Sequence, residues 1–365
     1  MKRMKKAVVS LAVIAGCTVL AAGVSSCSAP SSPQQAAASR FLAKYTRPDG
    51  RVVRLDQGRD TVSEGQAYGM LLAEVAGDHR AFQRIWLWTH RHLEHRDGLF
   101  SFHANARGRV TSRQPASDAD LLIAWALLRY SGPRAAVWHR AGRRVAHAIL
   151  AYELASGPDG MLVLTAGPWA TGSPAGPSTL NPSYWSLPAM ESLARLTGSD
   201  VWHRLAVSAV TLTGQLSKNG KVLPPDWARL DSAGGVQPEP APDGSEPQVE
   251  YGPDAARTVI WFAASCDAQA RALAARWWPL LRSRARSRAL ALGVNGAIMT
   301  ATPVPLSLVA SAAAAKSAGD ATAASHLLRQ AMTKQRSYPT YYGGAWAALG
   351  LALLPSDGAL GVCHH

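Results

Sequence analysis

The chain has 365 residues, of which 47% are hydrophobic, so it is long enough for one large domain and too apolar for wholesale disorder. Its formal net charge is +14 at pH 7, but no nucleic-acid-binding motif accompanies that charge, which argues against a nucleic-acid partner. Only four cysteines are present, which excludes a scaffold built on disulfides.

Residues 1–26 are predicted to be an export signal. A basic start precedes an apolar run over residues 7–24, which is short for a membrane span and ends in small residues. Val24-Ser25-Ser26-Cys27 then resembles a bacterial lipoprotein signal, in which Cys27 is lipidated and becomes the new N-terminus. We therefore expect an exported protein tethered to the extracytoplasmic face of a membrane. Plain secretion, or retention of the apolar run as an anchor helix, is the competing interpretation.

Residues 27–36 are predicted to be a tether, since they are mostly Ser, Ala, Pro and Gln. Residues 37–355 form one domain whose apolar pattern is helical almost throughout. Residues 356–365 are expected to be a C-terminal tail that is frayed at Cys363-His364-His365. Several predicted helices end at Gly and the next begins at once, which indicates helical hairpins. The predicted helices cover residues 37–45, 64–76, 79–94, 118–130, 134–154, 183–197, 200–217, 253–265, 267–287, 303–316, 319–334 and 341–354.

Twelve helices in hairpins favour an all-α, closed (α/α)6 barrel in which six inner helices are wrapped by six outer ones. A helical solenoid would give a similar count, but no fixed repeat period is visible. Four longer loops separate the helices, and loops of that length inside a compact domain usually carry function. They cover residues 95–117, 155–182, 218–252 and 288–302.

Acidic residues open three of the predicted helices. Glu64 follows Ser63, which can cap the helix, and its carboxylate would complement the helix dipole. Glu64 would serve as a general acid only if burial or a neighbouring carboxylate raised its pKa. Ser117 with Asp120 resembles a capping box, whereas Asp118 sits one position into its helix and can project past the helix end.

Asp254 opens a third predicted helix, and Arg257 lies three residues further on. At that spacing the two side chains share one helix face. The pair is either an ordinary surface salt bridge or a catalytic base held by its arginine. Two or three acids that converge on one groove can act as the acid and the base that cleave a glycosidic bond.

Four segments in order carry a resemblance to a known family. The chain resembles glycoside hydrolase family 8 from about residue 40 to residue 354. The resemblance implies an (α/α)6 barrel that hydrolyses internal β-1,4 linkages of cellulose or a related glucan with inversion. The similar segments are residues 63–70, 116–124, 181–184 and 225–227.

The resemblance also implies roles for single residues. Glu64 would be the general acid and Asp254 the general base, with their carboxyl groups about 6.5–9.5 Å apart. Asp118 would bind and distort the sugar at the cleavage point, and Arg257 would hold Asp254. The expected substrate-binding residues are Arg257, Tyr68, Trp185, Trp227 and Tyr342.

Aromatic side chains suit a glucan, because its sugar rings present apolar faces. Trp185, Trp227 and Tyr342 sit in or near the motif loops, so we expect them to be sugar platforms. Two positions depart from the family pattern. Pro253 stands where an aromatic residue commonly precedes the base, and Phe102 stands where relatives often carry Trp.

No cofactor and no metal are expected, since one helix face cannot present His90, His92 and His95 together. Chitosan or xylan remains an alternative substrate, and a catalytically decayed glycan-binding lipoprotein remains an alternative function. Whether the protein joins a cellulose-producing assembly, and whether Cys266 pairs with Cys363, stay open. An arginine cluster is either a solvated helix face or a binding site for nucleic acid or an anionic envelope polymer. It comprises Arg276, Arg282, Arg284, Arg286 and Arg288.

Overall fold

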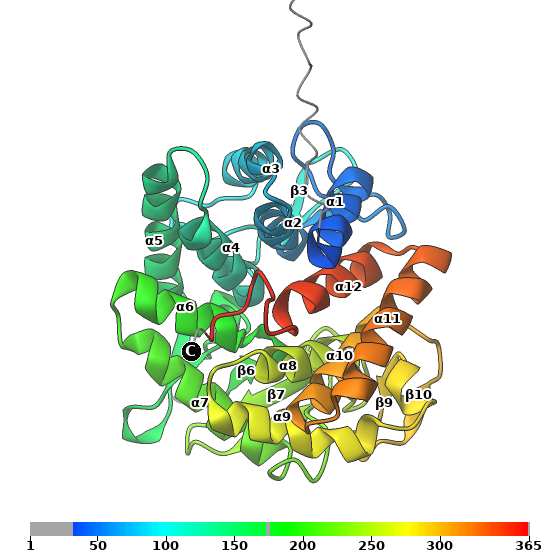
Figure 1. Ribbon diagram of the computed structural model, residues 1–365. Coiled ribbons are helices and arrows are strands. Elements are labelled where there is room, and N and C mark those ends of the chain that lie inside the picture. The colour runs from blue at the N-terminus through cyan, green and yellow to red at the C-terminus, as the bar shows by residue number, and fades with distance from the viewer. Residues whose placement is uncertain (1–31, 173–175, 364–365) are drawn as a thin grey trace, which may run out of the picture. The chain divides into compact units, whose positions relative to one another are not determined.

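The computed structural model describes residues 32–172 and 176–363. The predicted export signal, most of the tether and Cys27 lie outside the described residues. The described part contains twelve α-helices (Figure 1). They are α1 Pro33–Tyr45, α2 Ser63–Ala76, α3 His79–His92, α4 Ser117–Arg129, α5 Ala135–Tyr152, α6 Leu187–Thr197, α7 Val201–Leu216, α8 Pro253–Ala263, α9 Ala268–Leu281, α10 Pro305–Ser317, α11 Ala321–Ser337 and α12 Tyr341–Leu353.

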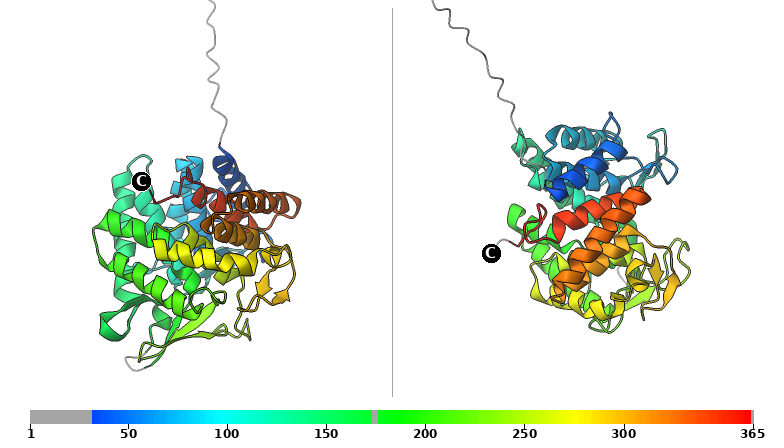
Figure 2. Two further views of the ribbon diagram at one scale, coloured as in Figure 1. Left: turned by 60° about the horizontal axis from the view of Figure 1, so that its bottom comes forward. Right: turned by 45° about the vertical axis from the view of Figure 1, so that its right-hand side comes forward.

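The even-numbered helices form a closed inner ring. Each of them contacts the next, and α12 contacts α2 to complete the ring. Helices α2, α4, α10 and α12 are buried around nearly their whole circumference, whereas outer helices such as α3 and α5 bury only one side. Figure 2 shows the outer helices packed around this ring. The predicted (α/α)6 barrel is therefore confirmed.

The two ends of the barrel differ in their connections. Each inner helix from α2 to α10 follows a loop from the preceding outer helix, and these loops carry every strand found in the described residues. All strand pairings are antiparallel. The strands are β1 Thr61–Val62, β2 His103–Ala104, β3 Val110–Ser112, β4 Leu154–Ser156, β5 Leu162–Leu164, β6 Ser178–Leu180, β7 Trp227–Leu230, β8 Val236–Glu239, β9 Ala291–Leu292 and β10 Ile298–Thr300.

The sheets add support to this end of the barrel. Strands β1-β2-β3 and β6-β7-β8 form two three-stranded sheets, while β4-β5 and β9-β10 are two-stranded. Four short 3₁₀ helices lie among the strands, namely η1 Pro158–Gly160, η2 Pro168–Ala170, η3 Pro182–Tyr184 and η4 Arg286–Arg288. The four predicted long loops all belong to this end, where the inner helices begin.

The other end of the barrel consists of tight turns from inner to outer helices. Asp78, Asp267 and Asp320 each cap an outer helix, because their side chains accept a hydrogen bond from the backbone N–H three residues on. Gly77 and Gly198 end α2 and α6 with left-handed φ angles of 68° and 71°, which an L side chain rarely adopts.

Inner helices α2, α4 and α8 begin without a side-chain cap. The predicted caps are therefore wrong: Ser63 and Ser117 lie inside α2 and α4, and Val62 and Ala116 precede them. The Ser117 hydroxyl donates to the carbonyl of Thr165 instead. These helix starts pack against the loop layer, so their side chains bond to other segments rather than to their own helix.

The N-terminal boundary also differs from the prediction. Helix α1 begins at Pro33, where Ser32 and Gln35 form a capping box, so the predicted tether overlaps the first turn of α1. Pro at the start of a helix costs no hydrogen bond, which allows the helix to begin there. Among the described residues, no helix is both long enough and apolar enough to span a membrane.

The C-terminal segment is ordered as far as Cys363, so the predicted fraying is wrong at that residue, while His364 and His365 lie outside the described residues. Leu360 and Val362 are buried against the core, and a disulfide joins Cys363 to Cys266. Four tryptophans within the helices, namely Trp86, Trp88, Trp125 and Trp277, are core side chains, and Trp278 is only partly buried.

Candidate active site

Three carboxylates meet at the end of the barrel where the inner helices begin. Glu64, Asp118 and Asp254 lie in the first turns of α2, α4 and α8. Helix N-termini carry partial positive charge, and these three helices leave their N-termini uncapped by side chains. Negative side chains are therefore favoured at this end of the ring.

One arginine joins the three acids. Arg257 Nη1 donates to Asp118 Oδ2 at 2.8 Å and to Glu64 Oε2 at 3.2 Å. Its Nη2 donates to Asp254 Oδ1 at 2.7 Å. Only 2% of the Arg257 side chain is exposed, so the ion pairs are shielded from water. The predicted contact between Arg257 and Asp254 is confirmed, and its bridging of all three acids was not foreseen.

Glu64 is placed so that its environment favours the protonated form. Burial raises the pKa of Glu64 to about 7, with Arg257 opposing that rise and Asp118 adding to it. The Tyr68 hydroxyl lies 3.4 Å from Glu64 Oε2. Side-chain exposure of 16% still leaves the carboxyl group open to a substrate. Burial and a neighbouring carboxylate thus raise the pKa of Glu64, which is the property that a general acid at this position requires.

Asp118 lies deeper than Glu64. Its Oδ1 accepts from the backbone N–H of Ala119 at 2.7 Å, while its other oxygen faces Arg257. Burial raises the pKa of Asp118, and Arg257 opposes the shift. Behind it, Asp120 Oδ1 accepts from the Phe100 N–H at 3.0 Å, which is not the contact of a capping box.

Asp254 is the most exposed of the three acids, with 24% of its side chain accessible. Asn181 Nδ2 donates to Asp254 Oδ2 at 2.6 Å, so both carboxylate oxygens are oriented by donors. Ser183 adds a hydroxyl 2.7 Å from Arg257 Nη2. Neither Asn181 nor Ser183 was predicted as a site residue, although both belong to a segment that carried the family resemblance.

Pro253 occupies the first position of α8, directly before Asp254. Proline has no N–H to lose at that position, and its fixed φ suits a helix start. The departure from the family pattern therefore stabilises the helix that carries Asp254, although it supplies no aromatic ring there.

An aromatic groove adjoins the acids. We use this name for the hollow lined by Phe102, Trp169, Tyr184, Trp227, Pro242 and Asp243 together with residues 112 and 114–116. The Tyr184 ring connects it to the acids, since its centroid lies 5.5 Å from the Arg257 guanidinium carbon. Trp169, at 41% exposure, was missed from the sequence, whereas Trp227 lies in the groove as expected.

The remaining predicted platforms have different positions. Trp185 is 1% exposed and its Nε1 donates to the Leu164 carbonyl, so its prediction as a sugar platform is wrong. Tyr342 is half-buried, and Tyr68 lies fully buried with its ring centroid 6.5 Å from that of Tyr342. Tyr68 reaches the site only through its hydroxyl, 3.2 Å from Arg257 Nη1.

Metal-ligand side chains gather in two places among the described residues. One group is Glu191 with Cys266 and Cys363, but the disulfide occupies both sulfur atoms. The second group is Asp226, Glu246 and Glu250, in the loop before α8. The histidines of α3 and its C-terminal loop belong to neither group.

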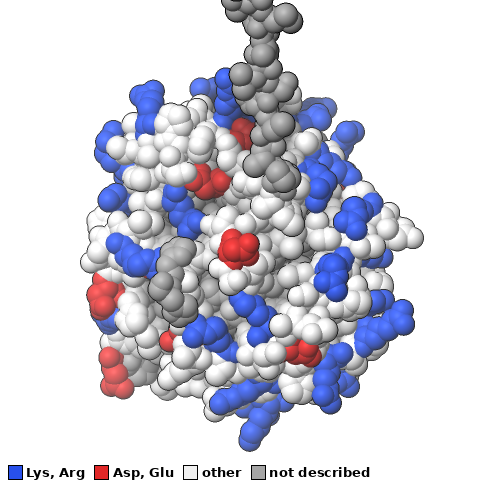
Figure 3. Space-filling view, in the orientation of Figure 1, with Lys and Arg blue, Asp and Glu red and all other residues white. Residues whose placement is uncertain are grey.

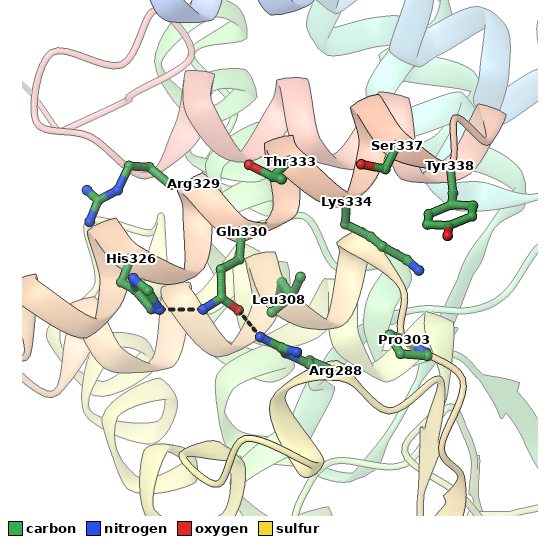
Figure 4. A pocket seen from close by; sticks show the side chains of 10 residues that line it. All are labelled: Arg288, Pro303, Leu308, His326, Arg329, Gln330, Thr333, Lys334, Ser337 and Tyr338. Atoms are coloured by element: carbon green, nitrogen blue, oxygen red, sulfur yellow. Dashed lines mark hydrogen bonds between the residues drawn. The ribbon is translucent and has the colours of Figure 1, made fainter.

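Positive side chains outnumber acidic ones over the face drawn in Figure 3. A basic groove lies beside α11, and Figure 4 shows Arg288 at one edge, joined through Gln330 to His326. This name denotes the hollow lined by Arg288, Pro303, Leu308, His326, Arg329, Gln330, Thr333, Lys334, Ser337 and Tyr338. Of the predicted arginine cluster, Arg288 belongs to it, and Arg282 and Arg284 line an adjoining hollow.

Comparison with known proteins gives consistent matches. The sequence model of the glycosyl hydrolases of family 8 matches residues 12–353. A probable endoglucanase of Novacetimonas hansenii is 33% identical over 61% of this chain, and an endoglucanase of Cellulomonas uda is 32% identical over 56%. These matches span 64% and 57% of the relatives' own lengths. The structure of the endo-β-1,4-glucanase CMCax from Acetobacter xylinum superposes with a TM-score of 0.70 and 27% identity, covering 87% of this chain and 96% of that one.

Proposed function

This chain belongs to family 8 of the glycosyl hydrolases, and we propose that it hydrolyses internal β-1,4-glucosidic linkages of cellulose or a related glucan with inversion. One observation carries the proposal: carboxylates from three separate helices meet at one buried arginine beside an aromatic groove. Two carboxyl groups on opposite sides of a sugar linkage are what inverting hydrolysis requires.

Glu64 is the proposed proton donor. Its raised pKa keeps a proton available near neutral pH, and its partial exposure lets the leaving oxygen approach. The Tyr68 hydroxyl helps to orient the carboxyl group. Protonation of the leaving oxygen by Glu64 then accompanies cleavage of the glycosidic bond.

Asp254 is the proposed base, and it takes a proton from the water that attacks the anomeric carbon. Arg257 and Asn181 each donate to one of its oxygens, so the carboxylate is held in one orientation. Each carboxylate oxygen can accept a further hydrogen bond, which leaves room for the water. Attack from the face opposite the leaving group gives inversion.

Substrate contacts are proposed for Asp118, Trp227 and Tyr342, with Tyr184 and Trp169 added from the geometry of the site. Aromatic rings offer flat apolar surfaces to the faces of glucose units. Arg257 is buried beneath the acids, so we assign it the positioning of the three carboxylates rather than direct contact with the sugar.

The test is hydrolysis of soluble cellulose and mixed-linkage glucan by the wild type and by Glu64→Gln. We expect reducing-sugar release to fall with the variant, and the initial product seen by NMR to be the α-anomer. Glu74→Gln, near the opposite end of α2, is the matched control because a glutamine oxygen can still accept from Ser131. Equal release by wild type and Glu64→Gln would refute the proposal, and cellulose binding without hydrolysis would favour a decayed enzyme. A panel with xylan and chitosan decides between substrates.

Export with a lipid anchor at Cys27 is proposed from the leader sequence alone. Radiolabelled palmitate should enter the wild-type protein in its bacterial host and should not enter Cys27→Ser. Label in both proteins, or in neither, would contradict the anchor, and secretion of an unlabelled mature chain would support plain export.

A further inference from the structure

Three carboxylates gather where the loop after β8 returns to α8. Asp226 directly precedes β7, while Glu246 and Glu250 lie between β8 and α8. One oxygen from each side chain lies within 4.8 Å of the others. We propose that Asp226, Glu246 and Glu250 form a binding site for one calcium ion, which fixes this loop against the start of α8. The proposal goes beyond the hydrolase function and adds a metal that the sequence did not predict.

Asp226 is the fixed member of the group. Its Oδ1 accepts from the backbone N–H groups of Gly252 and Ala255 at 2.9 and 2.6 Å. Its Oδ2 is buried without a hydrogen-bond donor, although the residue is only 1% exposed. A buried carboxylate oxygen without a partner is unfavourable, and such an oxygen facing two further acids points to a bound cation.

The backbone around the group is pinned independently of any ion. The Asp226 N–H donates to the Glu250 carbonyl at 2.9 Å, and the Ala241 N–H donates to the Glu246 carbonyl at 3.1 Å. The three side chains therefore approach one another because of how the two strands and the loop are tied. A preorganised cluster binds an ion with less ordering cost than a mobile loop would.

The negative charge of the group is not balanced by side chains. Among the residues that the structure describes, the ion pairs of lysine, arginine and histidine involve other acids. Three carboxylates this close repel one another unless a cation or protons neutralise them. Burial raises the pKa of Glu246 to about 7, with Asp254 and Glu250 adding to the rise. Protons shared among the three carboxyl groups would also relieve their repulsion, so the experiment must distinguish a bound cation from shared protons.

The donor set selects the kind of ion. All three ligands are oxygens, which suit hard cations such as Ca²⁺ and Mg²⁺ rather than zinc or copper. Glu246 and Glu250 are half-buried, so water can complete the coordination. Calcium accepts about 6–8 oxygens in flexible geometry, whereas magnesium demands a near-ideal octahedron and dehydrates reluctantly. Several carboxylates on a loop therefore favour calcium.

The ion would connect the loop to both parts of the site. The loop contributes Pro242 and Asp243 to the aromatic groove, and Asp226 holds the backbone of the turn that carries Asp254. Calcium should therefore restrict the loop and raise the stability of the folded chain. Only the effect on Asp254 rests on the proposed hydrolase function, because binding itself does not require catalysis.

The experiment uses the full chain after treatment with EDTA and titrates Ca²⁺ by isothermal calorimetry. We expect one ion per chain with a Kd of about 10⁻⁶–10⁻³ M, and a Tm that rises with Ca²⁺ concentration. The double variant Glu246→Gln, Glu250→Gln should bind roughly tenfold more weakly or not at all, because two ligand charges are lost. Asp231→Asn, in the turn between β7 and β8 and outside the cluster, should bind as the wild type does.

Two outcomes would overturn the site. The first is the absence of both heat and Tm shift with wild type up to about 10 mM Ca²⁺, which would assign the cluster to shared protons. The second is equal Ca²⁺ binding by the double variant. Circular dichroism of the ion-free proteins tests whether the double variant is folded. If it is not, Glu246→Gln alone replaces it, and Ca²⁺ protection of residues 231–250 from proteolysis in the wild type supplies a second measurement.

Discussion

The acidic end of the barrel and the basic groove beside α11 hold their charges in different ways. Glu64, Asp118 and Asp254 are far apart in the sequence, yet they share the buried Arg257. The arginines of residues 276–288 are close in the sequence, yet among the described residues none of them pairs with an acid.

This difference shows which charges contribute to the stability of the fold. Shielded ion pairs are strongly coupled to one another and to folding, whereas exposed cations are screened by water and salt. Closeness in sequence is thus a poor guide to a charged site, and convergence of helix ends is a better one.

The largest effect is expected for Asp254→Asn. Asparagine keeps the size of the side chain but cannot take a proton from water, so kcat on soluble cellulose should fall about 10²–10⁴-fold. Asp231→Asn, in the turn between β7 and β8, provides a control of equal charge change. A loss below about tenfold for Asp254→Asn would contradict its assignment as the base.

Arg257→Leu should produce the largest loss of stability. Three carboxylates would then remain close together without their shared donor, which costs about 3–5 kcal/mol in the free energy of unfolding. Arg284→Leu removes an exposed cation, and its effect should stay within about 0.5 kcal/mol. Urea denaturation of both variants measures the difference. Similar values for the two would remove the contrast between the regions.

The disulfide tests whether the opposite end of the barrel acts independently of the acids. Cys266 and Cys363 are 97 residues apart, and opening so long a loop in Cys363→Ser should cost about 2–4 kcal/mol. The kcat should stay near that of the wild type, because the acids are anchored on other helix ends. Thermal unfolding and initial rates below the Tm measure the two quantities separately. A parallel loss of kcat would show that the two ends are coupled.

The sequence predicts the helices better than their ends. Apolar spacing is a local property, so eleven of the twelve helices begin and end within four residues of their predicted limits. The helix predicted over residues 267–287 ends six residues early, at Leu281. Ser63 and Ser117 were misjudged as caps, because the inner helices begin against the loop layer rather than in solvent. The local sequence around a helix start does not reveal whether distant segments bury it.

The same limit applies to the site. The family resemblance predicts Glu64, Asp118 and Asp254 as candidate site residues, but it does not reveal their shared contact with Arg257, which joins residues 193 and 139 positions apart. Trp185 was misjudged because a place in a motif does not reveal which way a ring points. Trp169 was missed because it lies in a loop outside the similar segments.

The pH dependence of hydrolysis should follow Glu64. The acid must carry a proton before reaction, and its pKa is raised to about 7. As pH rises through that value the protonated fraction falls, so kcat/KM should drop about tenfold per pH unit above it. Arg284→Leu should give a superimposable profile. A kcat/KM that stays constant to about pH 9 would rule out Glu64 as the titrating acid.

The smallest effect is expected in the basic groove. Arg329→Gln with Lys334→Gln removes two of its cations, and neither residue forms a salt bridge in the described part of the chain. A neutral glucan has no charge for the groove to attract, so kcat and KM on soluble neutral glucan should change less than about twofold.

Binding to an anionic polymer tests whether the two cations of the groove attract negative charge. Retention on a heparin column should weaken with the loss of two cations and vanish for both proteins at high salt, where surface charges are screened. Unchanged retention would mean that the groove is only a solvated helix face. If hydrolysis of neutral glucan fell as far as it does for Asp254→Asn, the groove would be part of the catalytic machinery. The basic groove would then be coupled to catalysis in the same way as the buried carboxylates.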